Sequence, residues 1–222
     1  RLQKSVQKTK IHIDARGKMK RIELDCDFVS LASKVKAMRK IGQWESRSNE
    51  FPFYTLGKSA YFDGNSKIYY QQSEYLNALL FRSFYPLYKE VTKKLSAFFG
   101  EWIVFNPKLA LPGFHIFPAD KKLLSVAGNW HLDSPHETLG VGEKDAYAFT
   151  LAIELPTGGG GMDVKIGGDS DEYVEYKVGE LLLHDGMTPH RISPYRKYIE
   201  GEHRITMQGH IVRDGRELIT FW

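Results

Sequence analysis

Apolar side chains recur at helical spacing in two stretches of the first hundred residues. Between residues 27 and 44 they return every three or four positions, and Asp27 or Ser30 is placed to cap the first turn. The same period runs through residues 73–99, where Pro86 is expected to kink or split the helix and Gly100 to end it. We therefore predict two helices, and we assign the aromatic side chains of the second to packing against the core or a sheet.

After residue 100 the pattern changes to short runs of β-branched and aromatic residues, separated by Gly, Pro and Asp turns. The expected strands cover residues 101–105, 114–117, 123–133, 146–155, 162–166, 172–177, 180–184, 189–193 and 202–212, with the glycine-rich run 156–161 as a loop. This order predicts a mainly β fold with supporting α, an antiparallel sandwich or barrel whose outer face is braced by the N-terminal helices. Residues 1–100 would form a basic tail and helical support region, and residues 101–222 the β core, in one compact domain with a ligand cavity between its sheets.

Composition narrows the class of protein. The 42% hydrophobic and 13% aromatic content fits a folded globular chain, and no apolar run approaches the roughly 18 residues of a membrane span. Cys26 is the single cysteine, so no disulfide can form within the chain, which favours a reducing, cytoplasmic setting. Because acids flank Cys26 and negative charge raises a thiol pKa, we assign it a structural role.

The net charge of +4 is unevenly distributed. Residues 1–21 carry eight Lys or Arg and one Asp, whereas the remaining 201 residues hold 23 basic and 26 acidic side chains. We interpret the basic tail as a solvated end. The mildly acidic body argues against nucleic acid as a partner, since phosphate binding needs clustered positive charge at the site.

Two histidines and two carboxylates lie within the stretch GNWHLDSPHE, residues 128–137. On an extended strand, His131 and Asp133 would point to the same face and offer an imidazole and a carboxylate to one metal ion. His190 follows a predicted turn and would complete a facial triad that leaves three metal positions open. Arg204 and Thr206, two positions apart on a later strand, would offer a guanidinium and a hydroxyl to a carboxylate ligand in the same cavity.

This ordered set resembles the iron(II)- and 2-oxoglutarate-dependent dioxygenases, the double-stranded β-helix oxygenases. The likeness lies in His-x-Asp, a distant His and then Arg-x-Thr, and it extends to the stretches GELLLHDGMTPHRISP, GEHRIT and FTLAIELPTGGGG within residues 101–222. It implies that His131, Asp133 and His190 are iron(II) ligands and catalytic residues, and that Arg204 and Thr206 hold the distal carboxylate of 2-oxoglutarate. It also implies a double-stranded β-helix (jelly-roll) core and an oxygenase that uses O2 and releases succinate and CO2.

Asp133 bears on the reaction that this resemblance implies. The family's halogenases have a small residue at this position, so a carboxylate favours hydroxylation over halogenation, while desaturation and ring closure stay open. The expected substrate is a small molecule or an amino acid. Three acids expected near the pocket would suit a cationic substrate such as lysine or arginine, namely Glu137, Glu154 and Asp185.

Other side chains near these motifs are candidate substrate contacts. They are His115, Trp130, His136 and Glu137, with Tyr54 as a weaker candidate. For each of them, core packing or a solvated surface position is the alternative.

Other histidines are not assigned to the metal site, and two alternative classes of protein stay open. A second His-x-Asp, His12-Ile13-Asp14, lies in the basic tail without a matching downstream set. His184 is assigned to packing or to supporting a ligand, and His210 is expected on the cavity face of its strand. The rivals are a cupin-type metalloenzyme that does not use 2-oxoglutarate and a catalytically inactive jelly roll that binds a small acid or a protein.

Overall fold

A large antiparallel sheet forms the centre of the computed structural model, which describes residues 11–13, 19–63, 67–143, 145–165 and 171–222. Ten of the described strands belong to this sheet. Eight follow one another in the order β1 (Ile11–Ile13), β2 (Met19–Glu23), β10 (Glu180–Asp185), β7 (Tyr147–Glu154), β12 (His203–Asp214), β6 (Gly113–Pro118), β4 (Tyr54–Leu56) and β3 (Glu45–Ser46). The other two are β13 (Glu217–Phe221), which pairs with β12, and β5 (Ile103–Phe105), which runs parallel to β13.

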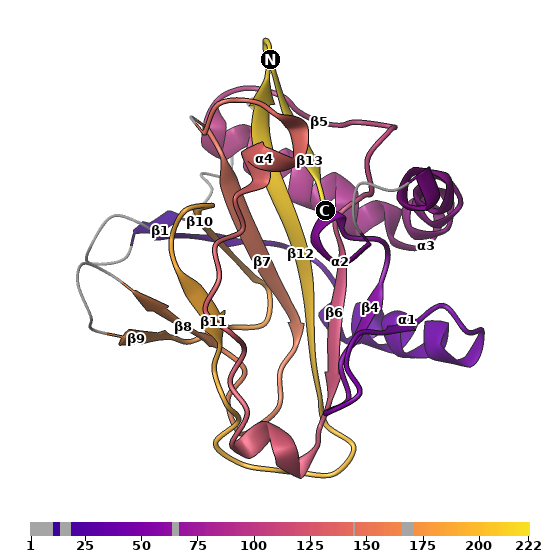
Figure 1. Ribbon diagram of the computed structural model, residues 1–222, viewed down its shortest axis with the longest axis vertical. Coiled ribbons are helices and arrows are strands. Elements are labelled where there is room, and N and C mark those ends of the chain that lie inside the picture. The colour runs from indigo at the N-terminus through magenta and orange to yellow at the C-terminus, as the bar shows by residue number, and fades with distance from the viewer. Residues whose placement is uncertain (1–10, 14–18, 64–66, 144, 166–170) are drawn as a thin grey trace, which may run out of the picture.

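A second sheet of three strands faces part of the first. Its order is β11 (His190–Ile192), β8 (Met162–Lys165) and β9 (Asp171–Val174), all antiparallel. Figure 1 shows this sheet and the long helix α3 (Lys67–Phe99) on opposite sides of β7 and β12. Two facing sheets of a mainly antiparallel chain form the double-stranded β-helix that the sequence predicts.

Two helices cover the outer face of the large sheet. Helix α1 (Phe28–Lys40) begins at Asp27, whose carboxylate accepts the Ser30 N–H at 3.0 Å, as expected for a cap. In α3 the backbone leaves helical geometry at Phe84, two residues before Pro86, which has no N–H to donate to the preceding turn. The apolar stripes of both helices pack on alternate residues of β7, β10 and β12 in the largest hydrophobic cluster, so the predicted bracing is confirmed.

The described residues also form three short helical segments. They are α2 (Ala60–Asp63), a 3₁₀ turn at Lys121–Leu124, and α4 (Pro135–Leu139). No helix within the described ranges is long and apolar enough to cross a bilayer.

The expected strand at residues 123–133 is wrong. Asp120 caps the 3₁₀ turn there, and the segment that follows is irregular apart from one bridge between His131 and His190. Its backbone contacts β11 at two separate points, where the Gly128 N–H donates to the Ile192 carbonyl and where His131 bridges His190, so it forms no continuous ladder.

The N-terminal residues take part in the sheet to a larger extent than their charge suggests. Strand β2 lies within the predicted basic tail and pairs with β10, with Met19 and Ile22 buried. Arg21 remains at the surface side and pairs with Glu180 at 2.9 Å. The second His-x-Asp lies outside the described residues at Asp14, and the side chain of His12 is likewise not described.

Cys26 is free and half-buried. Burial raises the pKa of its thiol, and Glu90 and Asp25 raise it further. This agrees with the structural role predicted for it.

Candidate metal centre and ligand cavity

His131 and Asp133 are positioned by backbone contacts to β11 and to the turn that precedes it. His131 and His190 exchange N–H to carbonyl hydrogen bonds of 3.1 and 3.0 Å. The carbonyl of Gly186 accepts the N–H groups of Asp133 and Ser134, at 3.1 Å each. A side chain at Gly186 would meet Pro135, because a Cβ there would lie 2.4 Å from its ring, so the turn requires glycine. The pair is thus placed by long-range contacts and not by strand alternation.

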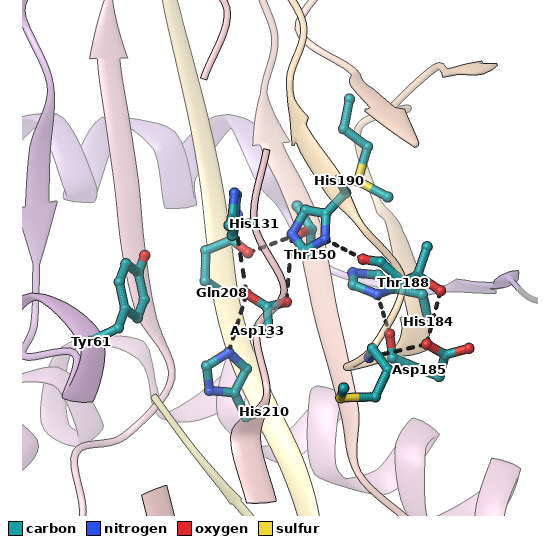
Figure 2. A network of polar contacts seen from close by, with 12 residues as sticks. Tyr61, His131, Asp133, Thr150, His184, Asp185, Thr188, His190, Gln208 and His210 are labelled. Atoms are coloured by element: carbon teal, nitrogen blue, oxygen red, sulfur yellow. Dashed lines mark hydrogen bonds and ion pairs between the residues drawn. The ribbon is translucent and has the colours of Figure 1, made fainter. Parts of the chain in front are cut away.

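The three predicted metal ligands converge in space. Ligand atoms of His131, Asp133 and His190 all lie within 4.8 Å of one another. Nε2 of His190 is 3.5 Å from one Asp133 oxygen, and Nε2 of His131 is 4.0 Å from the other. Figure 2 shows both imidazoles directed at the carboxylate. Two imidazoles and one carboxylate in this arrangement form the donor set of a facial triad.

Hydrogen bonds fix the orientation of both imidazoles. Nδ1 of His131 lies 2.8 Å from the carbonyl of Asn129, and Nδ1 of His190 lies 2.9 Å from that of Thr188. Because a carbonyl can only accept, Nδ1 carries the proton and Nε2 keeps its lone pair toward Asp133. Burial lowers the pKa of His190 to about 4, so this ring is neutral near pH 7.

Further histidines surround the Asp133 carboxylate. Nε2 of His210 is 3.8 Å from Asp133 Oδ1, and the ring of His184 packs at 4.8 Å against that of His190. Burial alone would raise the pKa of Asp133, but His210, His190 and His184 outweigh it and hold the pKa well below its usual range. Asp133 is therefore ionised, as a metal ligand must be. His184 lies outside the set of three, and its Nδ1 contacts the carbonyl of Asp185 at 2.7 Å.

Arg204 is a buried cation with no acidic partner among the described residues. Its side chain is 1% exposed, and its Nε donates to the carbonyl of Gly160 at 2.9 Å. The guanidinium lies 5.3 Å from the rings of both Phe117 and Tyr176, and Nη1 has no hydrogen-bond partner. Leaving a buried guanidinium nitrogen unpaired is costly, so this group is suited to an anionic ligand that enters the cavity.

The glycine run that was predicted as a loop holds this arginine in place. Gly160 has φ +115°, a conformation that side chains rarely adopt, and its carbonyl is the acceptor for Arg204. The loop therefore sets the position of the guanidinium.

A cavity of about 550 Å³ contains both the triad and Arg204. Its volume lies within the range of about 300–1,000 Å³ that is usual for small-molecule sites. Of the predicted substrate contacts, His115 lines it, and so does His210 on the strand face expected for it.

The other predicted site residues lie beside the cavity. Thr206 is fully buried and accepts Gln208 Nε2 at 3.0 Å, so its contact with a ligand stays a prediction. Trp130 lies between the cations of Lys165 and Arg191 at 5.0 and 4.6 Å.

Three further candidates are not among the residues that line the cavity. His136 and Glu137 lie on α4, and Tyr54 packs against Trp44 with ring centroids 5.6 Å apart. Substrate contacts by these residues stay predictions.

One wall of the cavity comes from aromatic residues that the sequence analysis did not select, although it named Tyr54 in the same segment. Residues 47–62 contribute aromatic side chains, and Phe117 of β6 completes what we call the aromatic wall: Phe51, Phe53, Tyr61, Phe62 and Phe117. The aromatic-rich run EFPFYTLGKSAYF, residues 50–62, was the available signal. It shows no regular period, so it predicted neither strand nor helix.

No protein-family model and no curated protein matches the chain. Solved structures do match. The non-heme alpha-ketoglutarate-dependent epimerase SnoN from nogalamycin biosynthesis has a TM-score of 0.54 at 14% identity, over 90% of this chain and 81% of its own. An N-substituted L-amino acid dioxygenase from Burkholderia ambifaria has a TM-score of 0.52 at 10% identity, over 93% and 87%.

A prolyl hydroxylase from Trichoplax adhaerens, solved with a peptide of hypoxia-inducible factor, has a TM-score of 0.51 at 11% identity, over 86% and 82% of the two chains. Identities this low establish the fold and not the reaction. The chain shares the double-stranded β-helix fold of these three solved structures.

Proposed function

We propose that this protein is an iron(II)- and 2-oxoglutarate-dependent oxygenase that hydroxylates a small molecule or an amino acid. The observation that carries the proposal is that a buried arginine, without an acidic partner among the described residues, shares one cavity with two histidines and a carboxylate. Each feature alone fits several classes of protein. Their combination fits a metal centre that works with a dicarboxylate co-substrate.

The residues present fit an iron(II) ion. His131 and His190 offer Nε2 lone pairs whose direction is set by carbonyls behind the rings, and Asp133 supplies the negative charge. His131 is 48% exposed on its side chain, whereas Asp133 and His190 are largely buried. The triad is thus open toward the cavity, where further ligands would enter.

The cavity also fits 2-oxoglutarate. Arg204 would receive the carboxylate that lies far from the metal, through Nη1, and the rings of Phe117 and Tyr176 would exclude water from that ion pair. When both are bound, iron(II) and 2-oxoglutarate supply the activation of O2, with release of succinate and CO2 and oxidation of the substrate. The protein's part is to orient the ligands, keep His190 neutral and Asp133 ionised, and keep the reaction away from bulk water.

Arg204 separates this proposal from one of its rivals, the metalloenzyme that does not use 2-oxoglutarate. In a metalloenzyme that does not use 2-oxoglutarate, a fully buried arginine is expected to neutralise a structural acid, such as Asp185 or Glu202. Asp185 instead accepts the Thr188 hydroxyl, and Glu202 accepts Thr157 groups. Neither pairs with Arg204 among the described residues.

Hydroxylation is the preferred reaction within the proposal. The carboxylate of Asp133 would fill the metal position that a halide needs, and Asp133 is held by the carbonyl of Gly186 on its backbone and by His210 on its side chain. Chloride should therefore not be transferred to a substrate by the natural chain.

The test is to add iron(II) and 2-oxoglutarate to the protein under argon and record the visible absorption of the chelate. We expect a weak charge-transfer band that is lost in His190→Ala, with a thermal melt to confirm that the variant is folded. On admission of O2 the natural chain should release succinate. No band, or a band that survives in a folded His190→Ala variant, would remove the proposal.

A further inference from the structure

The cavity contains few charges that a substrate could use. Its only carboxylate among the described lining residues is Asp133, which the proposed function assigns to the metal. The acids expected to receive a cationic substrate do not line it. Glu154 pairs with Lys36 at 2.7 Å, Asp185 closes its own turn by accepting Thr188, and Glu137 is exposed on α4.

The two arginines of the cavity other than Arg204 are already neutralised. Arg47 makes a two-fold hydrogen bond to Asp63 at 2.8 and 2.9 Å, with Glu45 a further 3.2 Å away. Arg191 pairs with Asp163 at 3.0 Å. Because each of these guanidinium groups already has a carboxylate counter-charge, it attracts an anionic substrate less strongly than an unpaired cation would.

The lining is instead rich in flat apolar rings. Seven of the described residues that line the cavity are Phe, Tyr or Trp. Phe53 and Phe117 stack with centroids 4.4 Å apart and an angle of 2°, and Phe51 stacks on Phe117 at 6.4 Å and 15°. Rings held parallel in this way present edges and faces of fixed direction to a planar ligand.

One uncharged polar pair interrupts this wall. The hydroxyl of Tyr61 and Nε2 of His115 share a hydrogen bond of 2.7 Å. Burial lowers the pKa of His115 well below its usual range, so the ring is neutral. Whichever atom donates, the Tyr61 oxygen keeps a lone pair or a proton for a ligand, and a ligand hydroxyl can complement either.

We propose that the substrate is an uncharged, ring-containing molecule that packs on the aromatic wall and is oriented by one hydroxyl hydrogen-bonded to Tyr61. This inference rests on the proposed function for the presence of a substrate. It narrows that function by disfavouring free amino acids, because their ammonium and carboxylate groups would find no unpaired opposite charge among the described lining residues once Asp133 and Arg204 hold iron and co-substrate.

Four probes on one naphthalene ring test the charge preference: 2-naphthol, naphthalene, 2-naphthoate and 2-naphthylmethylammonium. Their binding is measured by equilibrium dialysis at pH 7 under argon, with the protein saturated with iron(II) and 2-oxoglutarate and the chelate band recorded in the same samples. We expect the neutral pair to bind at least tenfold more tightly than either ion. Equal or tighter binding of the cation or the anion would overturn the inference.

The chelate band distinguishes a failure of the proposed substrate class from a failure of the proposed function. An intact band with no preference for neutral probes refutes the substrate class and leaves the proposed function standing. A preference for neutral probes in a protein without the band keeps the ligand class and removes the oxygenase.

Replacing Tyr61 tests the polar pair. Tyr61→Phe should weaken 2-naphthol about five- to tenfold, the value of one neutral hydrogen bond, and leave naphthalene unchanged. Tyr75→Phe, at an exposed tyrosine of α3 away from the cavity, is the control and should change neither. Equal losses for both probes in Tyr61→Phe would assign Tyr61 to packing alone, and no loss for either would remove it from the site.

Discussion

Replacing Arg204 by methionine should reduce the affinity for 2-oxoglutarate strongly and the stability of the fold only slightly. The methionine keeps an apolar stem between Phe117 and Tyr176 but removes the guanidinium. If Arg204 holds the distal carboxylate of 2-oxoglutarate, the variant loses the charge-assisted hydrogen bonds of that ion pair. Its affinity for the co-substrate should then fall steeply, while the fold is retained.

The size of the effect follows from the contacts. Hydrogen bonds to charged groups contribute about 1.5–3 kcal/mol each, so two of them give at least about 3 kcal/mol, a factor of about 150 in Kd. The folded protein itself loses the hydrogen bond from Nε to the Gly160 carbonyl and the cation–π contacts with Phe117 and Tyr176. Removing a buried cation that has no counter-charge among the described residues stabilises the fold and offsets part of this loss. The free energy of unfolding should therefore change by less than about 2 kcal/mol.

The assay is isothermal titration calorimetry of 2-oxoglutarate into the iron(II)-loaded protein under argon, beside a thermal melt. Arg213→Met is the matched control, since Arg213 lies on the same strand but pairs with Glu101 and Asp145 at the surface. Arg204→Lys keeps the charge without the planar fork and should lose about tenfold. A drop of less than tenfold in a folded Arg204→Met variant would refute the assignment.

Three further changes test other parts of the site. His190→Ala should weaken iron(II) binding by more than the roughly 10–100-fold that loss of an outer hydrogen-bond partner costs, measured by titration under argon; unchanged affinity would exclude His190 as a ligand. Asp63 has its pKa lowered from 3.8, since its hydrogen bonds and the charge of Arg47 outweigh the opposing effect of burial. The ionised Asp63 carboxylate therefore stabilises the fold above about pH 4, and this stabilisation is lost as the pH falls below that value. Urea titrations should show that the difference in unfolding free energy between the natural chain and Asp63→Asn shrinks from pH 7 to pH 3. Gly160→Ala, at φ +115° with Leu155 and Pro156 3.2 Å from the new Cβ, should cost about 1–3 kcal/mol and weaken 2-oxoglutarate, whereas Gly201→Ala, at φ +83° with nothing within 4 Å, should affect stability alone.

The sequence alone predicted which side chains could bind a metal and in what order they occur. It predicted only part of how they are placed in the structure. His131, Asp133 and His190 were selected by type, order and turns, and the structure brings their ligand atoms together. The reason given for the first two was wrong, because an irregular segment held by Gly186 and His190 replaces the expected strand. Contacts 50 or more residues away decide that geometry, and no local pattern contains them.

Strand β2 and the aromatic wall escaped prediction for related reasons. Strand β2 was hidden in a basic run because two buried side chains, Met19 and Ile22, carry its packing while the charged ones remain outside. The aromatic wall is assembled from loop residues, the short helix α2 and strand β6, so its members share neither period nor spacing. Helices α1 and α3 were found because their apolar period is local.

The origin of the aromatic wall has a consequence for how this molecule could diversify. Most of the wall belongs to residues 51–62, which are tied down by Arg47, Lys58 and Asp63 in a cluster of their own. The groups proposed to hold iron and co-substrate all come from residues 131–204, on other elements. Substitutions in the one segment can therefore reshape what enters the cavity while the oxidising centre stays intact, so that selectivity and chemistry can evolve separately.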